Sequence, residues 1–382
     1  MLFITGEYPP MQGGVGAYTA ELAKALVAQG SAVGVLTSRA AAAPPPGVTV
    51  YPLVTTWNWR IWSQALHVAR QMGATWLHVQ YQTAAYAMHP AINFAPWWWR
   101  RNGMRVAFTY HDLLPPYLFP KAGSKLRHWV TTRPALLSDL TVVTNQADHD
   151  RLARELSAHI PHLAHIPIGS NIAPRDFDAA ARRATRAAWG ADNATLLLGY
   201  FGFLNRSKGG LVLVEALSQI MARRPATKLL MIGERVGASD PTNFAYLQEV
   251  ETAIARLGLG DHIAWTGNLP DAAVSACLDA CDVVVLPYLD GASTRRGTLM
   301  AALAQGCAVV TTTPLTPLPA LTDGVSVALV APNDAAATAD AVLHIAAQPR
   351  LAEQLRRGAR QAAAAFTWEG IAAAHVRCYH AA

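Results

Sequence analysis

The chain has 382 residues, of which 52% are hydrophobic and only 15% are charged. This length exceeds one ordinary hydrophobic core and predicts two domains, and the absence of a long low-complexity tract argues against disorder. The formal charge of +6 and the pI of about 9.2 favour an anionic partner such as a nucleotide, a nucleic acid or a membrane surface, although a solvated basic face would give the same balance.

Strand-like and helix-like segments alternate through the first half of the chain. Alternating units of this length predict a parallel sheet covered by helices on both faces. The expected strands lie near 1–5, 32–37, 48–53, 75–80, 105–110, 139–143 and 163–167. The expected helices lie near 15–29, 61–72, 86–101, 123–137 and 146–156.

A second alternating series follows an Ala- and Arg-rich segment, 173–193, where we place the domain junction. Its strands are expected near 196–201, 227–232, 262–266, 282–286, 307–311 and 326–330, and its helices near 209–223, 243–257, 271–280, 295–305 and 334–347. The predicted fold is therefore α/β, with two Rossmann-like doubly wound domains facing across a cleft, at 1–175 and 190–366. Residues 367–382 form a last helix that we expect to pack back onto the first domain.

Cysteine and histidine usage favours neither a disulfide framework nor a metal site. The cysteines at 277, 281, 307 and 378 form no CxxC pair, which suits buried thiols in a reducing cytoplasm, and the thirteen histidines lack metal-ligand spacing. The start, MLFITGEYPP, has no basic segment, so we expect no signal peptide. Residues 71–99 lack charges but contain Gln, Asn and Pro, which argues against a membrane-spanning helix.

A glycine-rich loop follows the first expected strand, in the stretch ITGEYPPMQGGVGAYTAEL. It fails as a dinucleotide fingerprint, because Thr19 replaces the third glycine, the turn is too long, and residues 33–43 lack the expected acid. What remains is glycine backbone at a helix N-terminus, where free N–H groups and the helix dipole favour an anion. A turn without a ligand is the alternative.

Two loops of the second domain could also hold phosphate. The segment GYFGFLNRSKGG places Lys208 before a glycine at a helix start, where its ammonium can act as a point charge. In PYLDGASTRRGTL, we expect Ser293 or Thr294 to cap the next helix. Arg295 and Arg296 would then lie in its first turn, where the helix dipole disfavours cations unless an anion lies between them. A solvated surface pair is the alternative.

Polar residues follow several strands of the first domain. His111 and Asp112 come after the strand at 105–110, Asn145 after the strand at 139–143, and Gly169 and Asn171 after the strand at 163–167. Each alone could cap an ordinary loop. Because ligands bind outside the carboxyl ends of parallel strands, we expect them to line one cleft.

Together these motifs resemble the GT-B glycosyltransferases, specifically the GT4-like retaining branch, along nearly the whole chain. The similar segments, in order, are EYPPMQGGVGAYTAELAKAL, TYHDL, IPIGSNI, GFLNRSKGG, DACDVVVLPYLDG with MAALAQGCAVVTT, and FTWEGIAAAHVRCY. The chain departs from the family at two Glu positions eight residues apart, which align with Ser293 and Ala301, and at an Arg position that aligns with Phe203.

The resemblance implies that a hexose-type sugar moves from a UDP- or GDP-sugar to a glycan or lipid-linked acceptor, with retention and without a metal or other cofactor. A departing diphosphate gains negative charge, which preorganised donors and cations stabilise. The implied catalytic residues are His111, Lys208 and Arg206, and the implied acceptor or cleft residues are Gly13, Tyr18, Asp112 and Asn145. The implied donor-binding residues are Gly14, Val15, Gly202, Gly233, Ser293, Thr294 and Arg296.

Other interpretations stay open on the sequence alone. The missing Glu pair would also suit a catalytically silent protein that binds a nucleotide or a glycan, and the same fold could serve a sugar-nucleotide epimerase. We expect a cytoplasmic protein of polysaccharide biosynthesis that binds no nucleic acid. The aromatic and basic stretches at 97–105 and 120–133 give a peripheral membrane contact as one hypothesis, with an amphipathic surface helix as the alternative.

Overall fold

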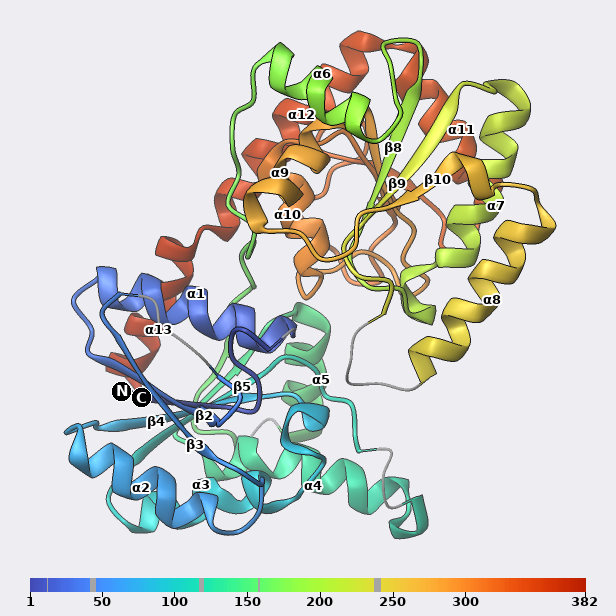
Figure 1. The fold of residues 1–382 in the computed structure, drawn as a ribbon. Coiled ribbons are helices and arrows are strands. Elements are labelled where there is room, and N and C mark those ends of the chain that lie inside the picture. The colour runs from blue at the N-terminus through green and yellow to red at the C-terminus, as the bar shows by residue number, and fades with distance from the viewer. Residues whose placement is uncertain (12, 42–45, 117–119, 157–158, 237–241) are drawn as a thin grey trace. The chain divides into compact units, whose positions relative to one another are not determined.

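The computed structural model describes residues 1–11, 13–41, 46–116, 120–156, 159–236 and 242–382. It divides into two compact units, Met1–Gly169 with Trp368–Ala382, and Ser170–Thr367. Each unit is a parallel β-sheet with helices on both faces (Figure 1). The predicted α/β class with two Rossmann-like doubly wound domains is confirmed. The predicted helices and strands are also found, with small shifts at their ends.

The sheet of the first unit has the strand order β3-β2-β1-β4-β5-β6-β7, with all neighbours parallel. The order reverses between β1 and β4, and at such a switch point the loops after the two strands diverge and leave a binding crevice. The strands are β1 Leu2–Thr5, β2 Val33–Ser38, β3 Val48–Val54, β4 Trp76–Tyr81, β5 Arg105–Tyr110, β6 Leu140–Val143 and β7 Leu163–His165.

Helices cover the two faces of this sheet with two separate apolar clusters. Alternate residues of β1 point to opposite faces, so that Leu2 and Ile4 pack with α2 and α3, whereas Phe3 packs with α1 and the C-terminal α13. The helices are α1 Gly14–Ala28, α2 Ile61–Gln71, α3 Ala91–Arg101, α4 Ser124–Leu137, α5 Gln146–Leu156 and α13 Trp368–Ala381. The expected helix at 86–101 begins only at Ala91, because a short 3₁₀ turn occupies Thr83–Tyr86.

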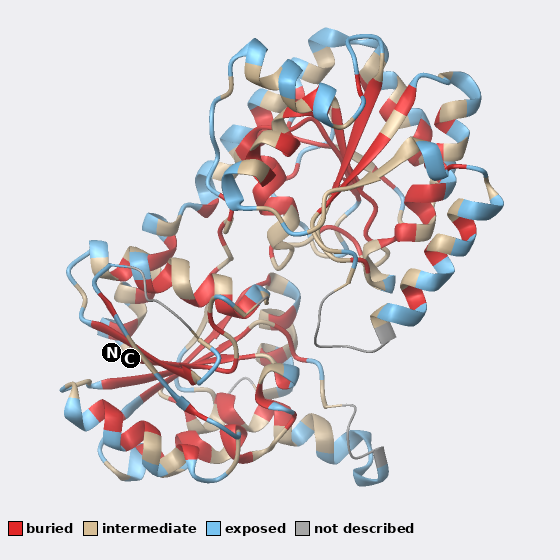
Figure 2. Cartoon of the chain, in the orientation of Figure 1, coloured by how far each residue is buried: buried red, intermediate tan, exposed pale blue. Residues whose placement is uncertain are grey.

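The second unit repeats the same construction with the strand order β10-β9-β8-β11-β12-β13 and a switch between β8 and β11. The strands are β8 Leu196–Phe201, β9 Thr227–Ile232, β10 Ile263–Trp265, β11 Val283–Leu286, β12 Val309–Thr312 and β13 Ala328–Val330. The helices are α6 Ala179–Ala188, α7 Gly210–Arg223, α8 Thr242–Arg256, α9 Asp271–Ala280, α10 Gly297–Gln305, α11 Ala335–Ala347 and α12 Pro349–Ala363. Figure 2 shows that the strands of both sheets are mostly buried while the outer helix faces are exposed.

Candidate functional site

The loops after β8 and β9 each begin with a glycine for which the family resemblance implies donor binding. Gly202 follows β8 and Gly233 follows β9, and both have positive φ angles of 104° and 105°. A Cβ atom on Gly233 would lie 3.8 Å from the Cα of Gly202, so the two backbones approach closely. On Gly202, a Cβ would lie 2.6 Å from Cγ2 of Thr298. Glycine is needed at Gly202 for both its conformation and its space.

Lys208 brings a cation to the same place. Its Nζ would lie 3.1 Å from a Cβ on Gly202 and lies 5.9 Å from the centre of the Phe203 ring. Burial and the neighbouring charge of Arg296 lower the pKa of this ammonium to about 7. No hydrogen bond or ion pair holds Nζ within the part of the chain that the structure describes. A desolvated ammonium without a carboxylate partner is suited to bind an incoming anion.

Arg296 lies beside this lysine, but its position corrects the sequence interpretation. The helix α10 begins at Gly297, with Arg296 as its N-cap residue and without a side-chain cap, so neither Ser293 nor Thr294 caps it. The anion expected between the two arginines is the protein's own Asp290, which pairs with Arg295 at 2.5 Å and also with Arg296. The guanidinium of Arg296 packs 4.8 Å from the Tyr288 ring centre.

Arg296 keeps part of its donor capacity free for another partner. Its Nη2 donates to Oγ of Ser207 at 3.2 Å, whereas its buried Nε has no hydrogen-bond partner within the described residues. Within the same residues, the buried Oγ of Ser293 also has none. Buried polar groups are rarely left unpaired, so these two atoms mark a place where a polar ligand would complete the hydrogen bonding.

Arg206 was expected to act together with Lys208, but its side chain does not join this cluster. Its guanidinium pairs with Glu249 on α8 at 2.5 Å and lies 5.0 Å from the Tyr246 ring centre. The side chain is 64% exposed. The charge of Arg206 is therefore partnered on the outside of the unit, and the cation cluster consists of Lys208 and Arg296.

In the first unit, the glycine loop forms the N-terminus of α1. Gly13 is the N-cap residue in an extended conformation, and a Cβ on Gly14 would meet nothing within 4 Å. A Cβ on Gly13, by contrast, would collide with the carboxylate of Glu7 at 1.8 Å. One Glu7 oxygen is buried and has no hydrogen-bond partner among the described residues, and burial raises the pKa of this carboxyl. The helix start is therefore open at Gly14, whereas Val15 is buried and Glu7 lies beside Gly13.

His111 lies in a buried polar cluster that the sequence did not predict. Its Nε2 is hydrogen-bonded to Oε1 of Gln80 at 3.0 Å, and the Gln80 amide also reaches Nε2 of His78 at 3.4 Å. His78 in turn is hydrogen-bonded to the hydroxyls of Thr109 and Tyr379. Burial lowers the pKa of His111 to about 3, so this imidazole is neutral near pH 7.

Tyr18 joins this cluster from the first helix. Its ring packs edge-on against His111, with centres 4.7 Å apart, and against Trp368 at 5.3 Å. Its hydroxyl is 3.5 Å from Nε2 of His375. Tyr18 and His111 are thus brought together by the packing of α1 and α13 on the same sheet face.

Asp112 and Asn145 are both engaged in local structure. The Asp112 carboxylate accepts from the backbone N–H of Leu114 at 3.1 Å and from Gln82 at 3.2 Å. Asn145 accepts from the N–H of Asp148 at 2.9 Å and donates to its carboxylate at 2.7 Å. This is the pattern of a side chain that caps α5.

Two family models match successive parts of the chain. The first, described as Glycosyltransferase Family 4, matches residues 12–171, and the second, described as Glycosyl transferases group 1, matches residues 195–348. The chain belongs to the family 4, group 1 glycosyltransferases. This membership agrees with the resemblance found in the sequence.

Relatives of this glycosyltransferase support the assignment. D-inositol 3-phosphate glycosyltransferases of Segniliparus rotundus and Geodermatophilus obscurus are 28% and 30% identical over 251 and 247 residues. The match covers 64% and 63% of this chain but only 53% and 52% of those proteins, so it spans about half the length of these relatives.

Solved structures with the same fold cover the whole chain. Sucrose-phosphate synthase from Thermosynechococcus elongatus has a TM-score of 0.75 and 22% identity, covering 99% of this chain and 98% of that one. Anabaena Alr3699/HepE in complex with UDP and glucose has a TM-score of 0.75 and 17% identity, covering 100% and 99%.

Several residues of interest in this glycosyltransferase were missed by sequence reasoning. Asp290 had a weak signal, because it lies in the loop before the Arg pair. Gln80, His78 and Tyr379 had none, since a Gln and a His within a strand resemble ordinary buried polar residues. Only pairing of β4 with β1 and β5, and packing of α13, brings them to His111.

The described residues hold no group of three or more His, Cys, Asp or Glu side chains that could bind a metal ion. Within the same residues, no helix combines the length and apolar character required to cross a bilayer.

Proposed function

We propose that this glycosyltransferase transfers a hexose-type sugar from a UDP- or GDP-sugar to a glycan or lipid-linked acceptor, with retention at the anomeric carbon and without a metal or other cofactor. One observation carries the proposal, namely the ammonium of Lys208, which pairs with no carboxylate of the described chain and lies with Arg296 at the strand-order switch of the second unit. The complexes of Alr3699/HepE with UDP and with UDP-glucose support this choice of donor.

Chemically, this pair of cations suits the leaving group. Negative charge grows on the diphosphate as the glycosidic bond breaks, and a preorganised cation in a partly desolvated place stabilises that charge most. Gly202 and Gly233 leave the backbone bare, so a phosphate can approach the loops closely. No carboxylate pair for a double displacement was found in the sequence, so attack from the front face with the leaving phosphate as base is our preferred mechanism.

The first unit retains predicted roles in this scheme. His111, being neutral, would donate or accept a hydrogen bond rather than act as a cation. Gly14 and Val15 keep their predicted role as diphosphate-binding backbone, because they lie in the first turn of α1, where a helix N-terminus favours an anion. The acceptor or cleft role stays a prediction for Gly13, Tyr18, Asp112 and Asn145. The side chains of Asp112 and Asn145 are already hydrogen-bonded within the first unit.

A donor-binding experiment tests the proposal. Calorimetric titration of the full chain with UDP, GDP and their sugar conjugates should reveal one tight nucleotide, whose release from its sugar is then followed with a panel of acceptors. Lys208→Ala should abolish binding and release. Lys228→Ala is the matched control, because Lys228 lies at the opposite, amino-terminal end of β9. Equal binding by the Lys208→Ala protein would refute the assignment.

A silent binding protein is the second candidate. The two positions where the family has Glu hold Ser293 and the buried Ala301, so the second unit lacks both carboxylates. Tight nucleotide binding without any release of the nucleotide, in the presence of cell extract as acceptor source, would favour this second function.

We also propose a peripheral membrane contact for the first unit. Trp59, Trp97 and Trp129 are 51%, 42% and 46% exposed, and their side chains line a groove of about 370 Å³ over α2, α3 and α4. Arginines stack on two of these rings, Arg101 on Trp97 at 4.6 Å and Arg133 on Trp129 at 5.4 Å. Exposed tryptophans with cations suit the interface of an anionic bilayer.

Sedimentation with phosphatidylserine vesicles at low salt tests the membrane contact. The protein should sediment with them, and the double variant W97A/W129A should stay in the supernatant. Sedimentation by the wild type with neutral and anionic vesicles alike, or with neither, would refute the electrostatic argument.

A further inference from the structure

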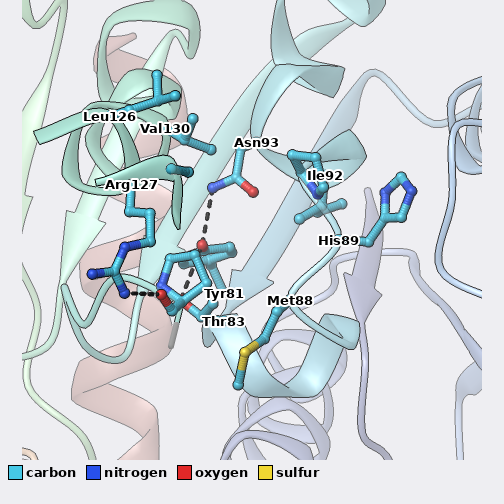
Figure 3. A pocket seen from close by; sticks show the side chains of 12 residues that line it. Tyr81, Thr83, Met88, His89, Ile92, Asn93, Leu126, Arg127 and Val130 are labelled. Carbon is cyan, nitrogen blue, oxygen red and sulfur yellow. Dashed lines mark hydrogen bonds between the residues drawn. The ribbon is translucent and has the colours of Figure 1, made fainter. Parts of the chain in front are cut away.

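The first unit contains an apolar cavity that no assigned role uses. It has a volume of about 230 Å³ and lies between the first turns of α3 and α4, next to the end of β4 (Figure 3). Figure 3 shows Leu126 and Val130 of α4 opposite Ile92 of α3, with Met88 at the lower side. An apolar cavity of about 150 Å³ is enough to bind benzene, so this one can accept a larger hydrocarbon group.

The polar side chains in its wall are already hydrogen-bonded. Asn93 donates to the hydroxyl of Tyr81 at 2.9 Å, and the Thr83 hydroxyl lies within bonding distance of the Leu114 carbonyl at 2.8 Å. These bonds remain in place when the cavity is filled by a ligand that offers no hydrogen bond. Since a polar ligand group would be desolvated there without compensation, the interior selects an apolar chain.

A cation lies in the wall of the same cavity. The guanidinium of Arg127 donates to the carbonyls of Pro116 at 2.8 Å and Gly123 at 3.3 Å, and no carboxylate pairs with it in the described part of the chain. The sequence around it is almost free of acids, since residues 22–138 contain eleven Lys and Arg but one acid, Asp112. The occupant should therefore combine an apolar chain with an anionic group.

The cavity lies at the edge of the sheet where we place the reaction. Tyr81 is the last residue of β4, one of the two strands at the switch point. Thr83 in the wall is hydrogen-bonded to the Leu114 carbonyl, and the Leu114 N–H donates to Asp112, the neighbour of His111. A chain held in the cavity would thus keep its head group on the same edge as His111.

We propose that this cavity binds the hydrocarbon chain of a lipid phosphate, with the phosphate on Arg127. The ligand class is one apolar chain that carries a phosphate head, and it narrows the acceptor to a lipid-linked one. Its role as acceptor rests on the proposed function, whereas its binding does not.

Decyl phosphate, kept below its micelle-forming concentration, is the probe, and its binding to the full chain is measured by titration calorimetry. Decyl phosphate should bind at least about tenfold more tightly than decanol, and inorganic phosphate should not displace it. Val130→Phe, which fills the cavity, should weaken binding about tenfold or more, whereas Val130→Ala should not. Arg127→Gln should remove the preference over decanol, and Lys125→Gln, on the exposed side of α4, should not.

Unchanged binding in a folded Val130→Phe protein, with its melting temperature kept, would overturn the proposal. So would displacement by inorganic phosphate, which would indicate a simple anion site, or binding seen only with vesicles, which would indicate a bilayer contact. Lys208→Ala should leave decyl phosphate binding intact. If decyl phosphate binds but no nucleotide does, the proposed function fails and the lipid site stands.

Discussion

The ionisation of Lys208 gives the sharpest test of the donor site. Because burial and Arg296 lower the pKa of the free ammonium to about 7, Lys208 loses its charge as the pH rises through this range. A bound diphosphate favours the charged form and raises the pKa again. Binding therefore takes up a proton, and affinity for UDP or GDP should fall as the pH rises above 7.

The size of this fall follows from the pKa. If the lysine stays protonated in the complex up to pH 9, the dissociation constant rises about fiftyfold between pH 7 and pH 9, or about 2.3 kcal/mol. The phosphates of the nucleotide add little change in this range, since phosphate loses its second proton with a pKa of about 6. If the Lys208 ammonium is partly open to water, the affinity for the nucleotide falls less between pH 7 and pH 9, so fiftyfold is the upper limit.

Titration calorimetry at pH 7, 8 and 9 and constant ionic strength provides the assay, and buffers of different ionisation enthalpy report the proton taken up. Lys208→Arg keeps its charge throughout this range, so its affinity should be nearly independent of pH. Lys208→Met should bind weakly at every pH. The argument from the lowered pKa would be refuted if the wild-type affinity for UDP or GDP changed less than threefold from pH 7 to pH 9 while Lys208→Met bound weakly.

Four further predictions follow from single residues. Gly202→Ala should lower the free energy of unfolding by about 1–3 kcal/mol in urea, because φ is positive and the new Cβ meets Thr298; an unchanged midpoint would contradict this. Gly14→Val should unfold like the wild type yet lose turnover, and normal activity would make the loop a plain turn. Arg296→Lys should weaken nucleotide binding about tenfold in calorimetry, since a lysine cannot keep both Asp290 and the Tyr288 ring, and wild-type affinity would remove Arg296 from the site. His375 is buried, and burial lowers its pKa to about 4, so the fold should lose stability as the pH drops below 6.5, by about 2 kcal/mol at pH 5. In His375→Gln, the free energy of unfolding should lack this part of its pH dependence. Equal slopes of that free energy against pH in the two proteins would contradict the prediction.

Local chemistry in the sequence was enough to predict the fold. Apolar runs such as LLLGYF and VVVL, separated by amphipathic helices, predict buried parallel strands, since only a sheet covered on both faces buries every residue of a strand. Glycine followed by a helix start marked the loops after β1 and β8. The helix ends were less certain, because Ser293 and Thr294 had the chemistry of a cap, but the backbone of this loop starts α10 only at Gly297.

The partners of the charged and polar side chains were decided by tertiary structure alone. Arg206 and Lys208 are two residues apart, yet Arg206 pairs with Glu249 of α8 while Lys208 lies next to Gly202 after β8. His78 and Tyr379 are 301 residues apart and meet because the C-terminal helix packs on the first sheet. A sequence specifies residue types and local periodicity, which determine the elements. Burial, pKa and pairing depend on which elements come together, and these quantities distinguish the cation pair Lys208 and Arg296 from the other basic residues of the chain.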